Sequence, residues 1–512
     1  MSRRGPMRDT FLLACVFVIA TCGLVYELLS ATLASYLLGD SVTQFSLVIG
    51  VYLSAMGLGS YLSKAIDDRI YDRFIDAQLV VAVAGGFAAP ILFFSFAYLD
   101  AVRPILFGLL IVLGTMVGLE IPLVLRILRE RSSLREVVAR VLALDYVGAL
   151  AASVAFPLLL LPYLGLTRTS LLFGAFNAAV ALYCTVAFER QIRRPRVRRT
   201  TAAAVLAVLV LGVVAGRSMD AEGEQALYQA PVIFTRKTPY QRITLTRTRD
   251  DLRLYLNGNL QFSSLDEYRY HEALVHPAMA AARHRARVLV LGGGDGLALR
   301  EILTHPGVEH VTLVDLDPAM TALFSSNEML RALNRGAFSD PRVEVVHDDA
   351  LNFLRTRGDA PPYDVVFVDL PDPNNYSLGK LYSRTFYRTL ARHLAPDGAA
   401  AIQASSPYLT PRAFWCIVRT VASAGLSVLP YHANVPTFGE WGFVLARHGP
   451  VEVPARLVPG PKRRFLDDAS LPALFVFPPD LGPRDVAINR LEDQPLVRYY
   501  EQDLAHGPVG AF

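Results

Sequence analysis

Acidic residues follow four apolar stretches in the second half of the chain, at the points where strands would end. Asp295 lies in VLVLGGGDGLALREI and Asp315 in VTLVDLD, Asp349 follows RVEVVH, and Asp369 and Asp372 lie in VDLPDPNNYS. Open α/β folds bind ligands beyond the carboxyl ends of their strands, so we expect these carboxylates to converge at one edge. One such acid alone would be explained by turn chemistry or helix capping. Several together favour a cationic ligand, such as an ammonium or a sulfonium ion.

The glycine-rich turn Gly292–Gly294 lets the backbone pass close to a ligand. Asp315 follows at about twenty residues, the spacing at which an acid hydrogen-bonds a ribose diol. Asp349, at the tip of the third strand, is placed to accept an adenine amino group. The string GGGDG lacks the GxGxxG spacing of dinucleotide sites, and its Asp295 would repel a pyrophosphate. The pattern therefore favours a nucleoside with a cationic group over NAD.

The elements that position these acids are short runs rich in Val, Ile and Leu that alternate with helical segments. Such runs predict a parallel sheet that helices cover on both faces. Ahead of them, QRITLTRT and LRLYLNGN predict two alternating strands, with a further turn at Asn257-Gly258. The predicted divisions are a small β subdomain over 219–265, a Rossmann-like α/β domain over 266–449 and a carboxyl-terminal extension over 450–512. In this extension, the segment NRLEDQPLVRYYEQDL is predicted to form a helix that packs on the preceding domain.

The first part of the chain is strongly apolar. The mean hydropathy is +0.34, and 53% of residues are hydrophobic. Runs long enough to cross about 30 Å of hydrocarbon occur at 11–38, 42–63, 77–98, 104–125, 141–162, 167–188 and 201–216. The first run is too long, and too closely followed by another, for a cleavable signal peptide. Residues 1–218 are therefore predicted to form a membrane domain with about seven transmembrane helices.

Charged residues in this membrane domain carry two further predictions. Arginines gather near the amino terminus and in 64–73, 126–135 and 190–199, which predicts that these segments face the cytoplasm. Three acids, Glu27, Glu120 and Asp145, fall inside or at the ends of predicted spans. An acid there is by default a functional hypothesis. Helix–helix hydrogen bonding is the simpler explanation, and a cation path or a contact with a polyamine is the alternative.

Composition also excludes some classes of function. The net charge of +4 gives no case for binding nucleic acid. The four cysteines include no CxxC pair and show no ligand spacing. Neither a metal site nor a disulfide framework is therefore indicated.

Together these residues resemble the spermidine synthase family, the polyamine aminopropyltransferases. The motifs that carry the resemblance are TPYQRI (238–243), LYLNGNLQFSSLDEYRYHEALVHP (254–277), LGGGDGLALREIL (291–303), VDLD (314–317), DDALNFL (348–354) and DLPDP (369–373). The amino-terminal spans resemble the membrane-anchored branch of that family. The resemblance implies a small β-hairpin domain followed by a seven-stranded sheet like that of class I methyltransferases. It also implies transfer of an aminopropyl group from decarboxylated S-adenosylmethionine to putrescine or a related amine, giving spermidine and methylthioadenosine.

The resemblance also implies a role for each candidate residue. The donor would be held by Gln241, Gly292, Gly293, Gly294, Asp315, Asp349 and Ala350. The amine would be held by Tyr270, His271, Asp295 and Asp372. Asp369 would accept the amine's proton, because an alkylammonium, with a pKa of about 10, has no lone pair for the attack. The donor is a co-substrate, and no cofactor or metal is expected, because the sulfonium is already an activated leaving group.

The departures from the family pattern fall mainly on the acceptor side. Leu370-Pro371 stands between the two acids where small hydroxyl residues are common, and Phe438 stands where a tyrosine is usual. Donor binding is therefore better defined than the identity of the amine.

Two other functions remain open from the sequence alone. A methyltransferase using S-adenosylmethionine has the same fold, and the choice of donor would separate it from an aminopropyltransferase. A non-catalytic polyamine sensor or transport component would explain the large membrane half, but the site residues are all intact.

We expect a multi-pass protein of the inner cell membrane, in contact with the lipid bilayer. A literal count of seven spans would put the catalytic domain outside. The donor is made in the cytoplasm, so the cytoplasmic side is preferred. Enzymes of this family are often homodimers or homotetramers.

Overall fold

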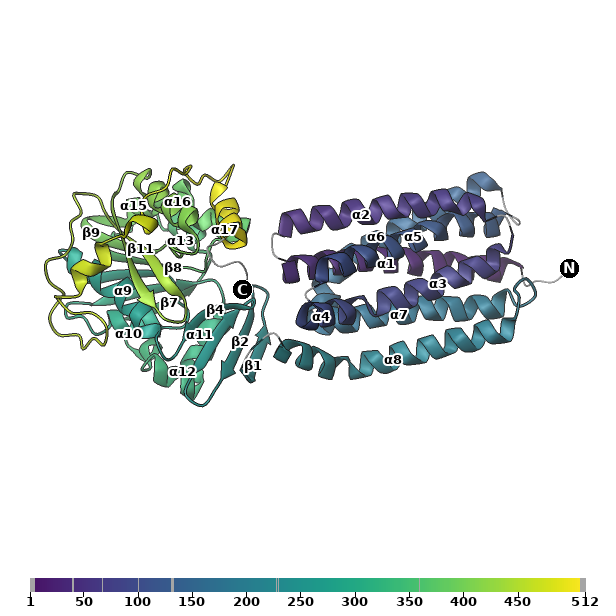
Figure 1. The fold of residues 1–512 in the computed structure, drawn as a ribbon, viewed down its shortest axis with the longest axis horizontal. Helices are drawn as coiled ribbons and strands as arrows, with labels where there is room; N and C mark the ends of the chain where they lie inside the picture. The colour runs from purple at the N-terminus through teal and green to yellow at the C-terminus, as the bar shows by residue number, and fades with distance from the viewer. Residues whose placement is uncertain are drawn as a thin grey trace. The chain divides into compact units, whose positions relative to one another are not determined.

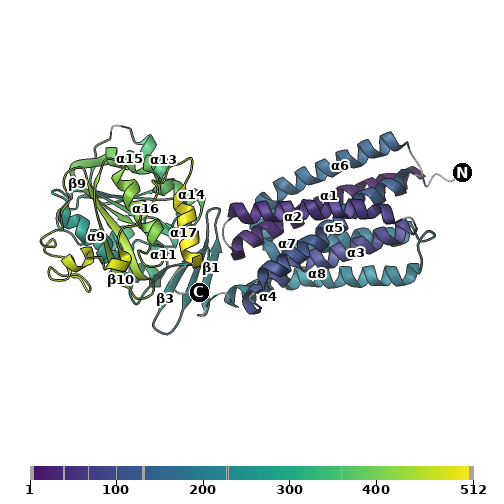
Figure 2. The same ribbon diagram turned by 45° about the horizontal axis from the view of Figure 1, so that its top comes forward.

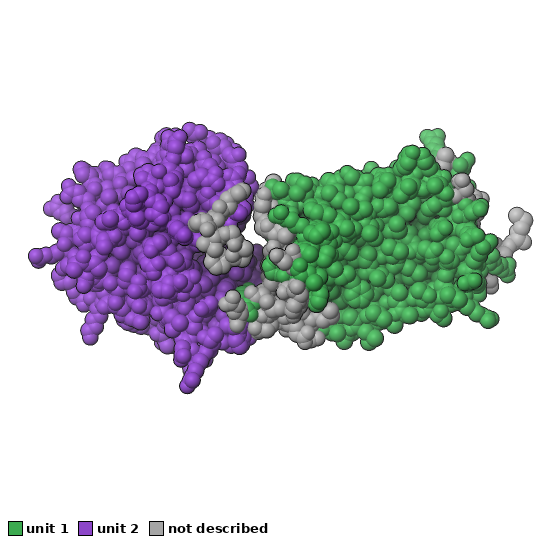
Figure 3. All heavy atoms as spheres, viewed as in Figure 1, with its two compact units in different colours: residues 1–229 green, residues 230–512 purple. Residues whose placement is uncertain are grey.

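The computed structural model describes residues 5–506, except 39–40, 67, 100, 130–132, 227, 229 and 359. Residues 1–4 and 130–132, which carry part of the predicted basic pattern, lie outside the described residues. The chain divides into two compact units, residues 1–229 and residues 230–512 (Figures 1 and 3). The first unit is helical, and the second contains two β-sheets with surrounding helices.

The first unit is a bundle whose helices pack closely through small residues. Its helices are α1 (Gly5–Leu38), α2 (Ser41–Leu62), α3 (Ile70–Gly86), α4 (Ala88–Tyr98), α5 (Val102–Arg129), α6 (Leu134–Ala155), α7 (Leu161–Ala187) and α8 (Pro195–Ala226), with a π-helical turn, η2 (Phe156–Leu160), between α6 and α7. A Cβ on Gly59 of α2 would lie 2.0 Å from the Thr115 carbonyl oxygen, and one on Gly118 of α5 would lie 2.1 Å from that of Met56. Glycine is therefore required where these two backbones touch.

Six helical segments among the described residues are long and apolar enough to cross a membrane. The longest, Arg135–Ala187, has 53 residues, or about 80 Å of helix if it were straight. It is interrupted at Gly165, whose φ of 74° is not helical. Because about 30 Å of helix crosses a bilayer, this segment corresponds to two of the seven predicted spans.

One end of the bundle holds several of the arginine-rich connections. The Arg126 guanidinium donates to the Ile66 carbonyl at 2.7 Å. Arg198, near the start of α8, contacts Asp72 at 2.5 Å and Asp76 at 2.9 Å. These contacts join the α2–α3 connection, α3, the end of α5 and the start of α8. The other end of α8 lies at the opposite end of the bundle (Figure 1).

The second unit begins with a small antiparallel sheet. Its strands, in order, are β1 (Val232–Lys237), β2 (Arg242–Arg247), β3 (Leu252–Leu256) and β4 (Asn259–Ser263). Asn257 and Gly258, with φ of 52° and 85°, connect β3 to β4. Positive φ at both positions is the geometry of a type I′ hairpin turn, so the turn predicted from this Asn-Gly pair is confirmed.

The larger sheet has seven strands in the order β10-β11-β9-β8-β5-β6-β7. They are β5 (Arg287–Gly292), β6 (His310–Asp315), β7 (Val343–His347), β8 (Tyr363–Asp369), β9 (Leu394–Gln403), β10 (Ser427–Val435) and β11 (Gly439–Arg447). The prediction of a parallel arrangement is confirmed for β5 to β9. The sheet as a whole is mixed, because the additional strand β11 runs antiparallel to both β9 and β10. The connection over 436–438 joins β10 to β11, and so short a connection allows only an antiparallel hairpin.

Helices cover both faces of this sheet because successive strand residues point to opposite sides. Leu289 and Leu291 pack with α13, α15, α16 and α17, whereas Val288 and Val290 pack with α9 and α10. The helices are α9 (Glu267–Ala281), α10 (Leu297–Ile302), α11 (Pro318–Ser326), α12 (Glu328–Leu333), α13 (Ala350–Thr356), α14 (Tyr376–Gly379), α15 (Arg384–His393), α16 (Pro411–Ala422) and α17 (Pro495–His506). In the carboxyl-terminal extension, α17 lies beside α16 (Figure 2).

Candidate active site

The ends of β5 and β8 are brought together by glycines. The Gly293 N–H donates to the Asp369 carbonyl at 3.1 Å. A Cβ on Gly292 would lie 2.0 Å from that same oxygen, and Gly292 and Gly293 both have positive φ, 87° and 65°. Only glycine fits this conformation and this close approach. The turn therefore places the Asp369 side chain directly beside the end of β5.

The next glycine of this turn sets the position of Asp315 at the end of β6. A Cβ on Gly294 would lie 2.5 Å from Asp315 Oδ2, and the Asp317 N–H donates to Asp315 Oδ1 at 2.9 Å. Burial raises the pKa of Asp315 to about 6, although N–H groups of Asp317 and Gly294 stabilise its charged form. The carboxylate thus faces the glycine turn at the adjoining strand end.

Asp369 is held by a tyrosine from α9. The Tyr270 hydroxyl donates to Asp369 Oδ1 at 2.6 Å. Burial raises the pKa of Asp369, while the charge of His271 and the hydrogen bond from Tyr270 oppose this rise. Asp369 as a residue is partly exposed, as a residue that meets a ligand must be. Asp369 therefore has the position and the enhanced basicity expected of a proton acceptor.

His271, the next residue of α9, is fixed by a buried ion-pair network. Its Nδ1 lies 2.7 Å from the Glu267 carbonyl oxygen and 2.9 Å from Glu267 Oε2. Arg300 in turn donates to both carboxylate oxygens of Glu267 at 2.9 Å. Burial acts to lower the pKa of His271, but the hydrogen bond and charge of Glu267, with the charges of Asp295 and Asp369, raise it to about 8.

A pKa of about 8 favours the protonated form of His271 at neutral pH, and the charges of Asp295 and Asp369 contribute to this value. Burial raises the pKa of Asp295 to about 6, with the charge of His271 opposing and that of Asp369 adding to the rise. Asp295 Oδ1 also accepts the Leu297 N–H at 2.9 Å. The charges of His271, Asp295 and Asp369 therefore influence one another.

Asp372 is oriented by three donors from separate parts of the chain. Its Oδ1 accepts from Gln403 Nε2 at 3.1 Å and from the Ser405 hydroxyl at 2.7 Å, and its Oδ2 accepts from the Tyr500 hydroxyl at 3.0 Å. Ser405 has a φ of 65°, a conformation that is uncommon for a residue with a side chain. Burial raises the pKa of Asp372, and these three hydrogen bonds restrain the rise.

The donor-side candidates are engaged with neighbouring polar groups. Gln241, just before β2, donates to Asp317 Oδ2 at 3.1 Å, which brings the small sheet to the end of β6. Asp349 caps α13 through its Oδ1, and its Oδ2 accepts from Lys380 Nζ at 2.7 Å. Ala350, almost fully buried, is the first residue of that helix.

The sequence reasoning missed several residues that position these groups. Tyr500, Gln403 and Ser405 hold Asp372, and Lys380 holds Asp349. The pattern of the segment containing Tyr500 predicted only that a helix would pack on the α/β domain. The Tyr382 hydroxyl lies within hydrogen-bonding distance of the carbonyls of Leu370 and Pro371, to which it donates. No local sequence signal links such distant partners.

The arrangement is suited to a cationic ligand. Carboxyl groups at the ends of β5, β6 and β8 have pKa values raised by burial, so a positive charge arriving between them would stabilise their ionised forms. Among the described residues, no group of three or more His, Cys, Asp or Glu side chains is arranged to hold a metal ion.

The chain was compared with known families, curated proteins and solved structures. Residues 267–452 match the spermine/spermidine synthase domain. The chain is 51% identical over 502 residues to polyamine aminopropyltransferase 2 of Ralstonia nicotianae, covering 97% of this chain and 98% of that protein. It is 47% identical over 496 residues to polyamine aminopropyltransferase of Leptospira interrogans, covering 97% and 99%. The crystal structure of spermidine synthase from Thermotoga maritima matches at 25% identity, with a TM-score of 0.43, over 48% of this chain and 84% of that one.

Proposed function

The chain belongs to the polyamine aminopropyltransferase family, and we propose that it transfers the aminopropyl group of decarboxylated S-adenosylmethionine to putrescine at the site formed by its acidic residues. The products are spermidine and methylthioadenosine, and the decarboxylated donor serves as a co-substrate. Gln241, Gly294, Asp315 and Asp349 hold the nucleoside part of the donor in this proposal. Asp295 and Asp372 hold the amine, and Asp369 accepts its proton.

The proposed reaction is a displacement at the propyl carbon next to the sulfonium sulfur. The amine nitrogen forms a bond to this carbon, and the C–S bond breaks with its electron pair moving to sulfur, which becomes a neutral thioether. The attacking amine is protonated in water, so it must first lose a proton to expose its lone pair. Asp369 takes this proton, and the raised pKa of its carboxyl group favours the transfer.

The carboxylates also balance the charge of the two substrates. A sulfonium ion and an ammonium ion repel each other as they approach in a site that excludes water. Asp295, Asp369 and Asp372 supply negative charge on the side where the two meet. The intact S-adenosylmethionine carries an additional carboxylate, which these acids would repel, so the site favours the decarboxylated donor.

One observation carries this proposal, the placement of Asp369 between the Tyr270 hydroxyl and the glycine turn. Asp369→Asn keeps the shape of the side chain but removes its basicity, and we expect it to abolish turnover while donor binding is kept. Asp397→Asn, at an exposed acid near the start of β9, is the matched control and should leave turnover unchanged. Equal turnover of Asp369→Asn and the unmodified protein would refute the role given to Asp369.

We further propose that the first unit spans the inner cell membrane. The support is that its apolar helices have the length of membrane spans and that arginine-rich connections gather at one end of the bundle. Membrane fractionation of the full chain should recover it with lipid and release it only with detergent. Release by high salt or alkaline washing would contradict a membrane-spanning unit.

We propose that the second unit, which carries the acidic site, lies in the cytoplasm, where the donor is made. The arginine-rich end of the bundle opposes this placement, because α8 leads away from that end and basic loops normally face the cytoplasm. All four native cysteines are buried, so an introduced cysteine can be labelled selectively. Asp485→Cys, at a fully exposed side chain of the second unit, should react with a membrane-impermeant maleimide only after cells are opened. Labelling in intact cells would place the catalytic unit outside.

A further inference from the structure

The carboxyl-terminal extension is bound along α16 before it forms α17. Trp415 of α16 donates from its indole Nε1 to the Leu481 carbonyl at 3.1 Å. Eight residues further along the extension, the Asn489 N–H donates to the hydroxyl of Thr420, also on α16, at 2.9 Å. The family domain that the chain matches ends at residue 452. The extension therefore adds to the α/β domain contacts that the matched domain does not itself contain.

Asn489 connects this extension to the stretch of chain that leads from β8 to α15. The residue is fully buried, and its Nδ2 donates to the Gly379 carbonyl at 2.9 Å and to the Tyr382 carbonyl at 3.1 Å. Its own carbonyl accepts the Arg384 N–H at 2.8 Å. A side-chain amide has two N–H hydrogens, so both are used on this stretch. Asn489 thus fixes three points of the backbone within six residues of each other.

Tyr382 carries this restraint to the residues between Asp369 and Asp372. Its side chain is fully buried, and its hydroxyl lies 3.1 Å from the Leu370 carbonyl oxygen and 3.0 Å from that of Pro371. These are the two residues that separate the acids in the chain. A displacement of Tyr382 would therefore move the backbone from which the Asp372 side chain projects.

The extension also packs against the same stretch without intervening space. A Cβ on Gly379 would lie 2.5 Å from Gln494 Oε1 and 2.7 Å from Val497 Cγ2. One turn further along α17, the Tyr500 hydroxyl donates to Asp372 Oδ2 at 3.0 Å. The extension thus acts on Asp372 in two ways, directly on its side chain and indirectly on its backbone.

We propose that Asn489 is a positioning residue for the amine, which holds the stretch 370–382 in place and so sets the position of Asp372. The proposal rests on the proposed function, because Asp372 is assigned to the amine there. A ligand binds more tightly to acceptors whose positions are fixed in advance, because less conformational freedom is lost on binding. A buried amide with two directed hydrogen bonds supplies such a restraint. An asparagine that only supported the fold would leave the affinity for the amine unchanged.

The test is equilibrium binding of radiolabelled putrescine to the full chain in detergent, with methylthioadenosine in place of the donor so that no transfer occurs. Asn489→Ala removes both amide hydrogen bonds and should weaken putrescine binding about tenfold. Lys380 in the same stretch contacts Asp349 through a part-exposed ion pair, so the affinity for methylthioadenosine should change by a few-fold or less. Trp415→Phe is the matched control, because it removes a hydrogen bond to the same extension at Leu481, away from this stretch. We expect the control to bind putrescine as the unmodified protein does.

A second variant tests the next link of the same chain of contacts. Tyr382→Phe keeps the buried ring but removes the hydroxyl, so it tests the proposal even if Asn489→Ala does not fold. It should weaken putrescine binding about threefold or more. Unchanged putrescine binding in both variants, or an equal weakening in Trp415→Phe, would overturn the inference. Putrescine binding without aminopropyl transfer by the unmodified chain would instead count against the proposed function alone.

Discussion

Replacing Tyr500 by Phe removes one hydroxyl from the environment of Asp372. This hydroxyl is the donor to Asp372 Oδ2, at 3.0 Å, whereas Oδ1 is held by Gln403 and Ser405. Tyr500 lies on α17, in the carboxyl-terminal extension. The substitution therefore tests whether the extension takes part in binding the amine.

The size of the effect follows from the type of bond. A hydrogen bond to a charged group contributes about 1.5 to 3 kcal/mol. At the lower bound, its loss reduces kcat/KM for putrescine about tenfold. The hydrogen bonds also restrain the pKa of Asp372, which burial raises, so removing one lets this pKa rise further. The carboxylate is then lost at a higher pH, and the acidic limb of the pH-rate profile moves upward.

The assay is steady-state kinetics of the full chain with each substrate varied in turn, across a range of pH. We expect the KM for putrescine to increase while the KM for the decarboxylated donor is unchanged. Tyr499→Phe is the matched control, because within the described part of the chain the Tyr499 hydroxyl only accepts a long hydrogen bond from the Ala487 N–H, at 3.3 Å. An equal loss in both variants, or a change confined to the donor, would refute the role assigned to Tyr500.

Three further predictions concern the donor side and stability. Gly294→Ala should abolish donor binding in a direct titration, because its Cβ would lie 2.5 Å from Asp315 Oδ2; retained affinity would contradict the tight turn. Lys380→Met should strengthen donor binding, because it frees Asp349 for the adenine amino group. The gain should be a few-fold or less, as expected for a part-exposed ion pair. Weaker donor binding in this variant would show that the lysine supports the donor. The pKa of His271 is raised to about 8 by a buried glutamate one turn earlier, which outweighs the effect of burial. Protonated His271 should therefore contribute about 2 kcal/mol of stability below pH 6.5, and this contribution is lost as the pH rises to about 8. A denaturant midpoint that shows no such loss between these pH values would contradict a charged His271.

Much of the second unit could be predicted from local patterns. The Asn257-Gly258 turn and the strand ending in Asp315 lie where the alternation and turn residues indicate. These features depend on neighbouring residues alone. The hairpin of β10 and β11 was not among the predicted strands, and the antiparallel direction of β11 follows from the short connection that joins it to β10.

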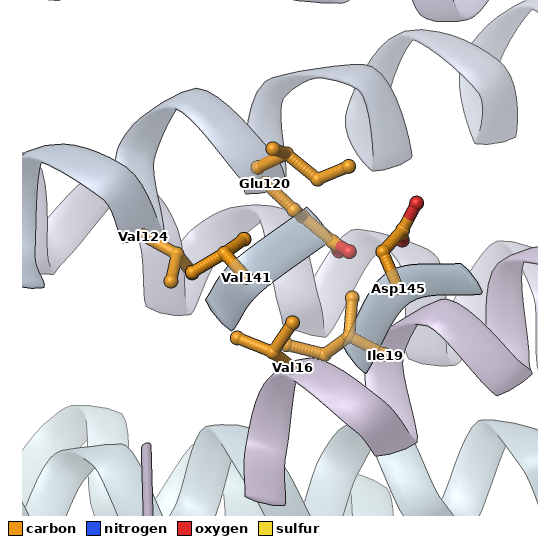
Figure 4. A pocket seen from close by; sticks show the side chains of 7 residues that line it. Val16, Ile19, Glu120, Val124, Val141 and Asp145 are labelled. Carbon is orange, nitrogen blue, oxygen red and sulfur yellow. The ribbon is translucent and has the colours of Figure 1, made fainter. Parts of the chain in front are cut away.

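The acids of the site could be predicted from the sequence, but the residues that hold these acids in place could not. Acids that follow strands can be located from sequence because parallel strands end at one edge. The partner of Asp372 on α17 and the partner of Asp349 at Lys380 depend on how distant segments pack. Neither carboxyl oxygen of Glu120 has a hydrogen-bond partner among the described residues, which likewise follows only from the packing of α1, α5 and α6 around it (Figure 4).

The central claim is that Asp369 accepts the proton of the attacking amine during aminopropyl transfer. Its most direct test is mass spectrometry of the products formed by the purified full chain from decarboxylated S-adenosylmethionine and putrescine, with S-adenosylmethionine as the alternative donor. We predict methylthioadenosine and spermidine in equal amounts from the decarboxylated donor, and neither product from Asp369→Asn that still binds this donor. Formation of both products by Asp369→Asn at the rate of the unmodified protein, or a methylated amine from S-adenosylmethionine, would contradict the account.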